Sequence, residues 1–363
     1  LYGEKVPANH PLRAVGFDLK TLTVRGSPVP VMERVVTKPS GAANFALSSN
    51  GTLEYEAGNV TGGGERNLVW VDREGKEEML PAEKRGYVYP RISPDETRVA
   101  LDIRDTGSDI WIWNFARQNL QRLTFDPGFN RGIAWTPNGE KLVFSQESDG
   151  EESLFWQSAD ASGAPERLTT AKAGRSQVPY AITRDGSQLL YGEPGSPPFD
   201  LFALSLNGDR TSRVLLNGPY NEHNGEVSPD GRWLVYQSDE SRSNEIYVRR
   251  FPSLDSRVQV SSGGGTRPMW AKNGRELFYL KADGTMIAVP VERSDGPALM
   301  TGSPKALFKG NYTAFQAGRT YDVSRDGQRF LMIKDAPAQA PAPIQLLVVL
   351  NWTEELKRLV PNK

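Results

Sequence analysis

A short pattern of polar and apolar positions recurs along the chain. A polar turn of the form Ser/Thr-x-Asp/Asn-Gly precedes an apolar run that ends in a large residue, as in residues 227–236 and 135–144. Asp-Gly and Asn-Gly favour tight turns because glycine accepts a positive φ. Alternating apolar positions are typical of half-buried strands. Each copy is therefore predicted to be a β-hairpin. The fourth turn positions are 51, 96, 139, 186, 231, 274 and 327.

The segments between these hairpins complete a repeat of about 45 residues. A second strand, often aromatic, follows each of the first six hairpins, at residues 68–71, 110–113, 154–156, 201–204, 246–248 and 286–289. A short outer strand follows in several copies, at residues 121–124, 166–169 and 257–260. Four strands per repeat of this length are typical of a β-propeller blade. The sequence therefore predicts an all-β propeller.

Seven hairpins predict seven blades, and eight blades with one incomplete are the alternative. Residues 14–18 and 29–36 have a strand-like pattern and precede the first hairpin, whereas the last hairpin lacks an outer strand. We therefore expect the N-terminal segment 1–36 to close the last blade and residues 353–363 to form a short tail. One domain over residues 1–363 is expected.

Composition and charge narrow the function classes. The 43 Lys and Arg residues balance 44 Asp and Glu residues, so we expect no nucleic-acid partner. The chain has no cysteine and only two histidines, which excludes thiol chemistry and a three-histidine zinc centre. Its longest apolar run, residues 344–350, is too short to span a membrane. We expect no cofactor, no metal, no membrane insertion of this segment, and a monomer.

The repeat resembles the TolB-like propeller repeat, a WD40-like class. The resemblance rests on Ser-Pro-Asp-Gly at 228–231, Asp-Ile-Trp at 109–111 and Arg-Leu-Thr at 122–124. A further ordered set is similar to the C-terminal propellers of membrane-anchored bacterial serine/threonine kinases. That set includes residues 16–19, 26–31, 68–75, 236–241, 245–252 and 348–352. The resemblance implies a periplasmic or extracellular propeller that binds a ligand or a partner.

Sequence motifs of catalysis are missing from the chain. It contains neither the Gly-rich, His-Arg-Asp and Asp-Phe-Gly motifs of a kinase nor the Gly-x-Ser-x-Gly elbow of an α/β-hydrolase. The alternative to a binding protein is an esterase- or lactonase-type hydrolase at the channel mouth. In that interpretation His223 is a general base, oriented by Glu222 or Glu226. A surface histidine bonded to the backbone is the simpler interpretation of His223.

Aligning the hairpins predicts a ring of side chains around the central channel. Five residues before each fourth turn position stand Ala46, Arg91, Ala134, Ala181, Glu226, Met269 and Asp322. Strand alternation can turn all of them toward the channel. Three nearby arginines, Arg131, Arg267 and Arg319, and His223 complete the predicted ligand-binding set. Alternatively, Arg91 pairs with Glu226 or Asp322 and only fills a wet channel.

These observations favour a non-catalytic binding propeller. We expect it to bind a small ligand or a protein at the central funnel, as the sensor or interaction domain of a bacterial signalling protein.

Overall fold

The turn residues build the same hairpin around the molecule. In the computed structural model, Ser93 Oγ donates to Asp95 Oδ1 (2.6 Å) and accepts from the N–H of Arg98 (3.0 Å). Ser324 repeats both bonds with Asp326 (2.6 Å) and Arg329 (2.9 Å). The fourth turn residue is left-handed in every copy: φ is 70–76° at Gly139, Gly186, Gly231, Gly274 and Gly327, 59° at Glu96 and 83° at Gly51. These positions favour glycine because a Cβ is strained there.

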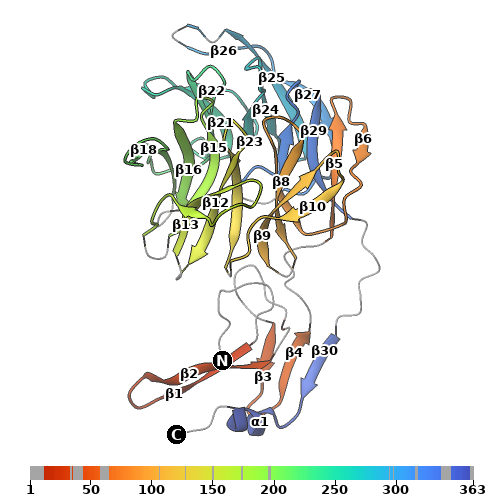
Figure 1. Cartoon of the computed structure of the whole chain (residues 1–363), viewed down its shortest axis with the longest axis vertical. Coiled ribbons are helices and arrows are strands. Elements are labelled where there is room, and N and C mark those ends of the chain that lie inside the picture. Colours follow the sequence, from red (N-terminus) through yellow and green to blue (C-terminus); the bar gives the residue numbers. More distant parts are fainter. Residues whose placement is uncertain are drawn as a thin grey trace.

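The structure describes residues 12–32, 35, 44–57, 65–105, 107–126, 128–148, 151–172, 175–194, 198–293, 295–296, 298–314, 318–336 and 345–359. Within these residues, six antiparallel sheets form the blades of a propeller (Figure 1). Blade 1 contains β7 (Tyr87–Ile92), β8 (Arg98–Arg104), β9 (Ser108–Asn114) and β10 (Asn119–Arg122). Blade 2 contains β11 (Asn130–Trp135), β12 (Lys141–Ser148), β13 (Glu151–Ser158) and β14 (Glu166–Arg167). Blade 3 contains β15 (Val178–Ile182), β16 (Gln188–Pro194), β17 (Phe199–Ser205) and β18 (Ser212–Leu216).

The other three blades follow the same strand order. Blade 4 contains β19 (Glu222–Val227), β20 (Trp233–Ser238), β21 (Glu245–Arg250) and β22 (Val258–Gln259). Blade 5 contains β23 (Thr266–Trp270), β24 (Glu276–Leu280), β25 (Thr285–Arg293), β26 (Met300–Thr301) and β27 (Lys305–Lys309). Blade 6 contains β28 (Tyr321–Val323), β29 (Arg329–Asp335), β5 (Arg66–Asp72) and β6 (Glu77–Met79). The first strand of each blade lines the channel.

Blade 6 closes the ring. Its inner two strands come from the C-terminal part of the chain and its outer two from the N-terminal part, with Leu331 opposite Trp70 in the register. The propeller and its closure by N-terminal strands are therefore confirmed. The closing strands are β5 and β6, however, and none of the described residues of segment 1–36 pairs with this blade. Within that segment, β1 (Leu12–Asp18) and β2 (Thr23–Met32) pair only with each other.

The prediction of seven blades is wrong, and so is the alternative of eight. The first predicted hairpin is present as β3 (Phe45–Leu47) and β4 (Leu53–Ala57), but it pairs with β30 (Gln345–Val349) in a separate sheet. The physical reason is its amphipathic strand. In β4, Leu53 and Tyr55 are buried whereas Glu54 is exposed, while β8 is buried at five successive positions. A blade strand is covered on both faces, so it needs the second pattern.

The separate sheet has a small core of its own. Val35, Leu53, Tyr55 and Trp352 are buried together. Trp352 begins the helix α1 (Trp352–Leu359), which overlaps the segment expected to form a short tail; residues 360–363 lie outside the described residues. In Figure 1 this sheet, α1 and the β1–β2 hairpin lie below the propeller. Among the residues that the structure describes, no helix has the length and apolarity needed to cross a membrane.

Apolar side chains fill the spaces between blades. One cluster joins blades 5 and 6 through Phe278, Phe308, Tyr321 and Phe330, and the Phe278 and Phe330 rings meet edge to face at 5.1 Å. Another joins blade 6 to blade 1 through Leu331 and Leu101. Such packing holds each inner strand in a fixed position around the channel.

Candidate ligand-binding site

A cavity of about 740 Å³ opens at one end of the channel. The turns between the first and second strands of the blades surround it, so we call this the turn end and the opposite end the strand-start end. Six members of the predicted ring line the cavity: Arg91, Ala134, Ala181, Glu226, Met269 and Asp322. The seventh, Ala46, lies on β3 in the separate sheet. The hairpin alignment therefore located the cavity from the sequence.

A second ring lines the rim and was not found by sequence reasoning. The residue after the first turn residue lines the cavity in all six blades: Pro94, Pro137, Arg184, Pro229, Lys272 and Arg325. The hairpin alignment contains the signal for this ring, because all six residues occupy the second position of their turns. Prolines occupy the position in blades 1, 2 and 4, and cations occupy it in blades 3, 5 and 6.

Arg319 crosses the channel. Its side chain is 3% exposed and donates from one nitrogen to Glu226 Oε2 (2.7 Å) on blade 4 and from the other to the carbonyl of Tyr180 (2.7 Å) on blade 3. Glu226 also accepts from the backbone N–H of Trp270 at 3.2 Å. Arg319 precedes β28, so these bonds tie opposite sides of the ring together. Glu226 is thus paired with an arginine, as the alternative interpretation expected, but its partner is Arg319 and not Arg91.

No carboxylate among the described residues is bound to Arg91. One of its terminal nitrogens donates to the carbonyls of Pro90 (2.6 Å), Arg319 (2.9 Å) and Tyr321 (3.3 Å). Its Nε is buried and has no hydrogen-bond partner among the described residues. Burial and the neighbouring Arg319 lower the pKa of Arg91 to about 10, so the side chain is charged at neutral pH. The expected pairing of Arg91 with Glu226 or Asp322 is therefore not formed by hydrogen bonds.

Asp322 is held by the backbone. Its carboxylate is 2% exposed and accepts from the N–H of Ile92 (2.7 Å) in blade 1 and of Val323 (2.8 Å) on its own strand. A carboxylate bound by two N–H groups is compensated without a cation. This contact joins blade 6 to blade 1 at the ring closure.

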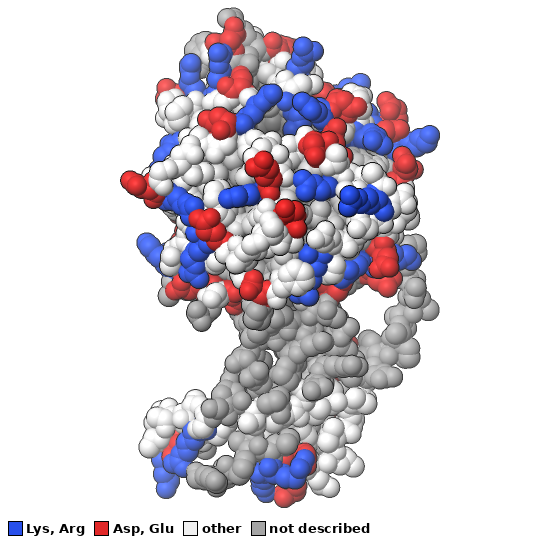
Figure 2. All heavy atoms as spheres, in the orientation of Figure 1, with Lys and Arg blue, Asp and Glu red and all other residues white. Residues whose placement is uncertain are grey.

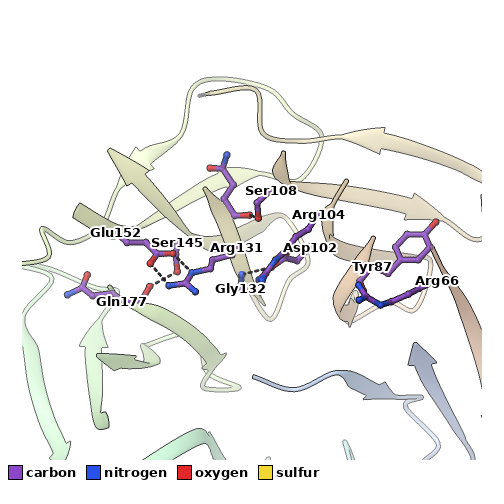
Figure 3. A network of polar contacts seen from close by, with 11 residues as sticks. Arg66, Tyr87, Asp102, Arg104, Ser108, Arg131, Gly132, Ser145, Glu152 and Gln177 are labelled. Carbon is purple, nitrogen blue, oxygen red and sulfur yellow. Dashed lines mark hydrogen bonds and ion pairs between the residues drawn. The ribbon is translucent and has the colours of Figure 1, made fainter. Parts of the chain in front are cut away.

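Arg131 and Arg267 lie away from the cavity, toward the strand-start end. Arg131 forms a two-bond ion pair with Glu152 on β13, and Figure 3 shows it pointing at that carboxylate. Arg267 is 7% exposed and donates to Thr266 Oγ1 (2.9 Å), and burial lowers its pKa. Of the predicted arginines, only Arg91 and Arg319 line the cavity.

His223 also lies outside the cavity, at the start of β19. Its ring packs on Phe199 with centroids 4.4 Å apart, and burial lowers its pKa to about 4. Its Nδ1 has no partner among the described residues, and Glu226 is bound to Arg319 instead. Burial and the carboxylates of Asp200, Asp239 and Glu240 raise the pKa of Glu222 to about 7. The structure therefore does not bring His223 and Glu226 together as a base and its orienting carboxylate.

Metal ligands are not grouped in the described part of the chain. No three His, Asp or Glu side chains there lie close enough to hold a metal ion. The charged groups of the cavity are guanidinium and ammonium groups together with carboxylates that already accept protein donors. This donor set is suited to binding a polar ligand by charge and hydrogen bonds.

The ring of blades and the cavity on its axis define the class of the protein as a β-propeller with a central binding cavity. The family model of the TolB beta propeller domain, PD40, matches residues 56–299. The chain belongs to this family.

Individual relatives are distant. The chain is 21% identical over 225 residues to an uncharacterized protein of Agrobacterium fabrum, covering 59% of this chain and 74% of that protein. It is 22% identical over 254 residues to the Tol-Pal system protein TolB of Helicobacter hepaticus, covering 59% of each. This chain thus matches less than two thirds of the length of that relative.

Two solved structures share the fold. A candidate TolB from Agrobacterium tumefaciens aligns with a TM-score of 0.60 at 16% identity, over 76% of this chain and 100% of that one. TolB from Acinetobacter baumannii aligns with a TM-score of 0.50 at 11% identity, over 80% and 78% of the two chains. At such identities the likeness concerns the fold alone.

Proposed function

We propose that the chain is a non-catalytic binding propeller whose central cavity receives a ligand or a segment of a partner protein. The observation that carries this proposal is the cavity of about 740 Å³ at the turn end, lined by charged and apolar side chains from all six blades. Its volume falls within the usual range of ligand sites, about 300–1,000 Å³. Membership of the TolB propeller family supports a binding role.

A finer role is part of the same proposal. The sequence resembles propellers attached to membrane-anchored bacterial kinases, and one relative is named a protein of the Tol-Pal system. Both likenesses favour a propeller outside the cytoplasm, in the periplasm or beyond it, that senses a ligand or contacts a partner. The sensor role rests on the sequence resemblance.

A thermal-shift screen tests the binding role. The purified chain is heated with a library of peptides, sugars and organic acids. A compound that binds the native state at a hundred times its Kd stabilises it by about 2.7 kcal/mol, which is several degrees in Tm. Each hit is then repeated with Ala181→Trp, which places a large side chain in the cavity because Ala181 lines it.

The matched control is Ala116→Trp, in the exposed turn between β9 and β10. We expect hits to stabilise the original chain and the control equally, and to lose their effect in Ala181→Trp. Hits that stabilise all three chains equally bind elsewhere and contradict the proposal. Parallel turnover of small esters by the purified chain would contradict the non-catalytic assignment.

A further inference from the structure

Three cations line the rim of the cavity. Arg184, Lys272 and Arg325 are exposed and line it from blades 3, 5 and 6. Among the described residues, none of the three side chains has a hydrogen bond or an ion pair. Their charges are therefore available to a ligand.

The carboxylates of the cavity are already bound by protein donors. Glu226 accepts from Arg319 and from the N–H of Trp270, and Asp322 from two N–H groups. At the rim, Asp95 accepts from Ser93 and Thr97, and Glu96 from the N–H of Arg325 at 2.6 Å. Each of these carboxylates thus already accepts at least one hydrogen bond from the protein, whereas the side chains of the three rim cations have no partner among the described residues.

Arg91 supplies a fourth charge, deeper in the cavity. It donates only to main-chain carbonyls, and its Nε is a buried donor without a partner in the described structure. A guanidinium in this state gains both a charge partner and a hydrogen bond from an entering carboxylate. The neighbouring Arg319 Nε is likewise buried without a partner among those residues.

Resting on the proposed function, we propose that the cavity binds an acidic peptide segment, with one carboxylate at Arg91 and others at Arg184, Lys272 and Arg325. A peptide fits better than a small anion because the three rim cations come from different blades and surround a cavity of about 740 Å³. The lining also includes apolar side chains, such as Trp135, Val227 and Met269, that suit the spacer residues of a peptide.

The face of the molecule shown in Figure 2 has no comparable concentration of cations. On the face shown in Figure 2, acidic and basic side chains are interspersed over the propeller without a large area of one sign. The formal net charge of the chain is −1. Binding of an acidic peptide therefore requires a local site, which makes charge reversal at the rim informative.

Calorimetric titration of the full chain tests the proposal. The probes are N-acetylated hexaglutamate, hexaglutamine and hexalysine amides, with citrate and pyrophosphate as small anions. We expect hexaglutamate to bind at least tenfold more tightly than every other probe. The triple variant Arg184→Glu, Lys272→Glu, Arg325→Glu should weaken hexaglutamate at least tenfold, because like charges then surround the opening.

The matched control reverses three exposed cations outside the cavity, in Arg117→Glu, Lys172→Glu, Arg250→Glu. It makes the same change in net charge and should keep hexaglutamate binding within about twofold. Equal weakening in both triple variants overturns the proposal, since the attraction would then be general. Circular dichroism and Tm measure whether both variants are folded. We expect both to fold, because the substituted side chains are exposed.

Other outcomes separate this proposal from the proposed function. Citrate or pyrophosphate binding as tightly as hexaglutamate overturns the peptide assignment. Hexaglutamine or hexalysine binding as tightly as hexaglutamate, or hexaglutamate failing to bind, overturns the acidic specificity. In each of these cases the proposed function stands if any ligand is lost in Ala181→Trp and kept in Ala116→Trp, and fails if none is.

Discussion

Arg131 and Arg104 at the strand-start end of the channel bind carboxylates, whereas Arg91 and the rim cations at the turn end do not. At the strand-start end, Arg131 pairs with Glu152, and Arg104 binds both oxygens of Asp102 at 3.0 Å (Figure 3). At the turn end, Arg91 binds only carbonyls, and the rim cations have no ion pair among the described residues. The difference teaches that the number of arginines in a channel does not locate a site. Cations that line a cavity and have no carboxylate partner do.

The largest loss of stability is expected at the strand-start end, from Arg104→Met. Asp102 is fully buried, and its remaining contact is the N–H of Gly132 at 3.3 Å. Losing the guanidinium leaves a buried charge unpaired, which costs about 3–5 kcal/mol of unfolding free energy. Urea denaturation measures the loss.

The double variant Asp102→Asn, Arg104→Met is the control, since it removes the orphaned charge as well. We expect it to recover a large part of the stability. A loss below about 1 kcal/mol in Arg104→Met would mean that the ion pair is not what stabilises this end.

A smaller loss is expected from Arg319→Met, at the boundary between the two ends. The Glu226 side chain is 15% exposed and keeps the N–H of Trp270, so its charge stays partly solvated. The expected cost is about 2–3 kcal/mol by urea denaturation, below that of a fully buried pair. The stability of Arg319→Lys should lie between those of the original chain and Arg319→Met, because lysine keeps the charge but not both hydrogen bonds. If Arg319→Met equals Arg104→Met in cost, solvation of Glu226 is negligible.

The strand-start end has two exceptions among the described residues: Arg267 binds no carboxylate, and Glu222 binds no cation. Glu222 is 5% exposed, its Oε2 has no partner among the described residues, and its pKa is raised from 4.5 to about 7 by burial and neighbouring carboxylates. Since the folded pKa exceeds the unfolded one, the folded state binds this proton more tightly. The resulting stabilisation is complete below pH 4.5 and is lost as the pH rises past 7.

The stability of Glu222→Gln relative to that of the original chain should therefore increase as the pH rises. We expect similar Tm values at pH 4 and a gain on the order of 1–2 kcal/mol at pH 8, less than the full shift implies because of solvent screening. Thermal melts of both chains from pH 4 to 8 measure the difference. His223 titrates in both chains, so it largely cancels. A difference that does not change with pH contradicts the assignment.

The propeller could be predicted from the sequence because its turns are local. Ser93, Asp95 and the left-handed fourth residue form the turn with contacts inside six residues. Every copy repeats them except the one that begins at Ala271, which has no hydroxyl group. The blade count failed because closure depends on a long-range pairing of β5 with β29. The alternation of Leu53, Glu54 and Tyr55 already indicated a strand with one wet face, and this signal distinguishes it from the blade strands.

The site was predictable in position but not in pairing. Inner-strand alternation placed Arg91, Glu226 and Asp322 around one cavity. It could not show that Arg319 reaches across the ring to Glu226, or that Glu152, two strands away in the same blade, pairs with Arg131. These partners are set by side-chain direction and by blade packing, which no local pattern encodes.

The smallest effect on stability is expected at the turn end, from Arg91→Met. The variant removes a half-buried charge that has no bound carboxylate, and methionine preserves much of the apolar stem. Relief from desolvation offsets the lost bonds to carbonyls, so urea denaturation should give a value within about 1 kcal/mol of the original chain. The same change at Arg104 costs several times more, because only there does a buried carboxylate lose its partner. Hexaglutamate affinity of Arg91→Met should nevertheless fall at least fivefold. A loss of stability as large as that of Arg104→Met would show that Arg91 serves to stabilise the ring and not to bind a ligand.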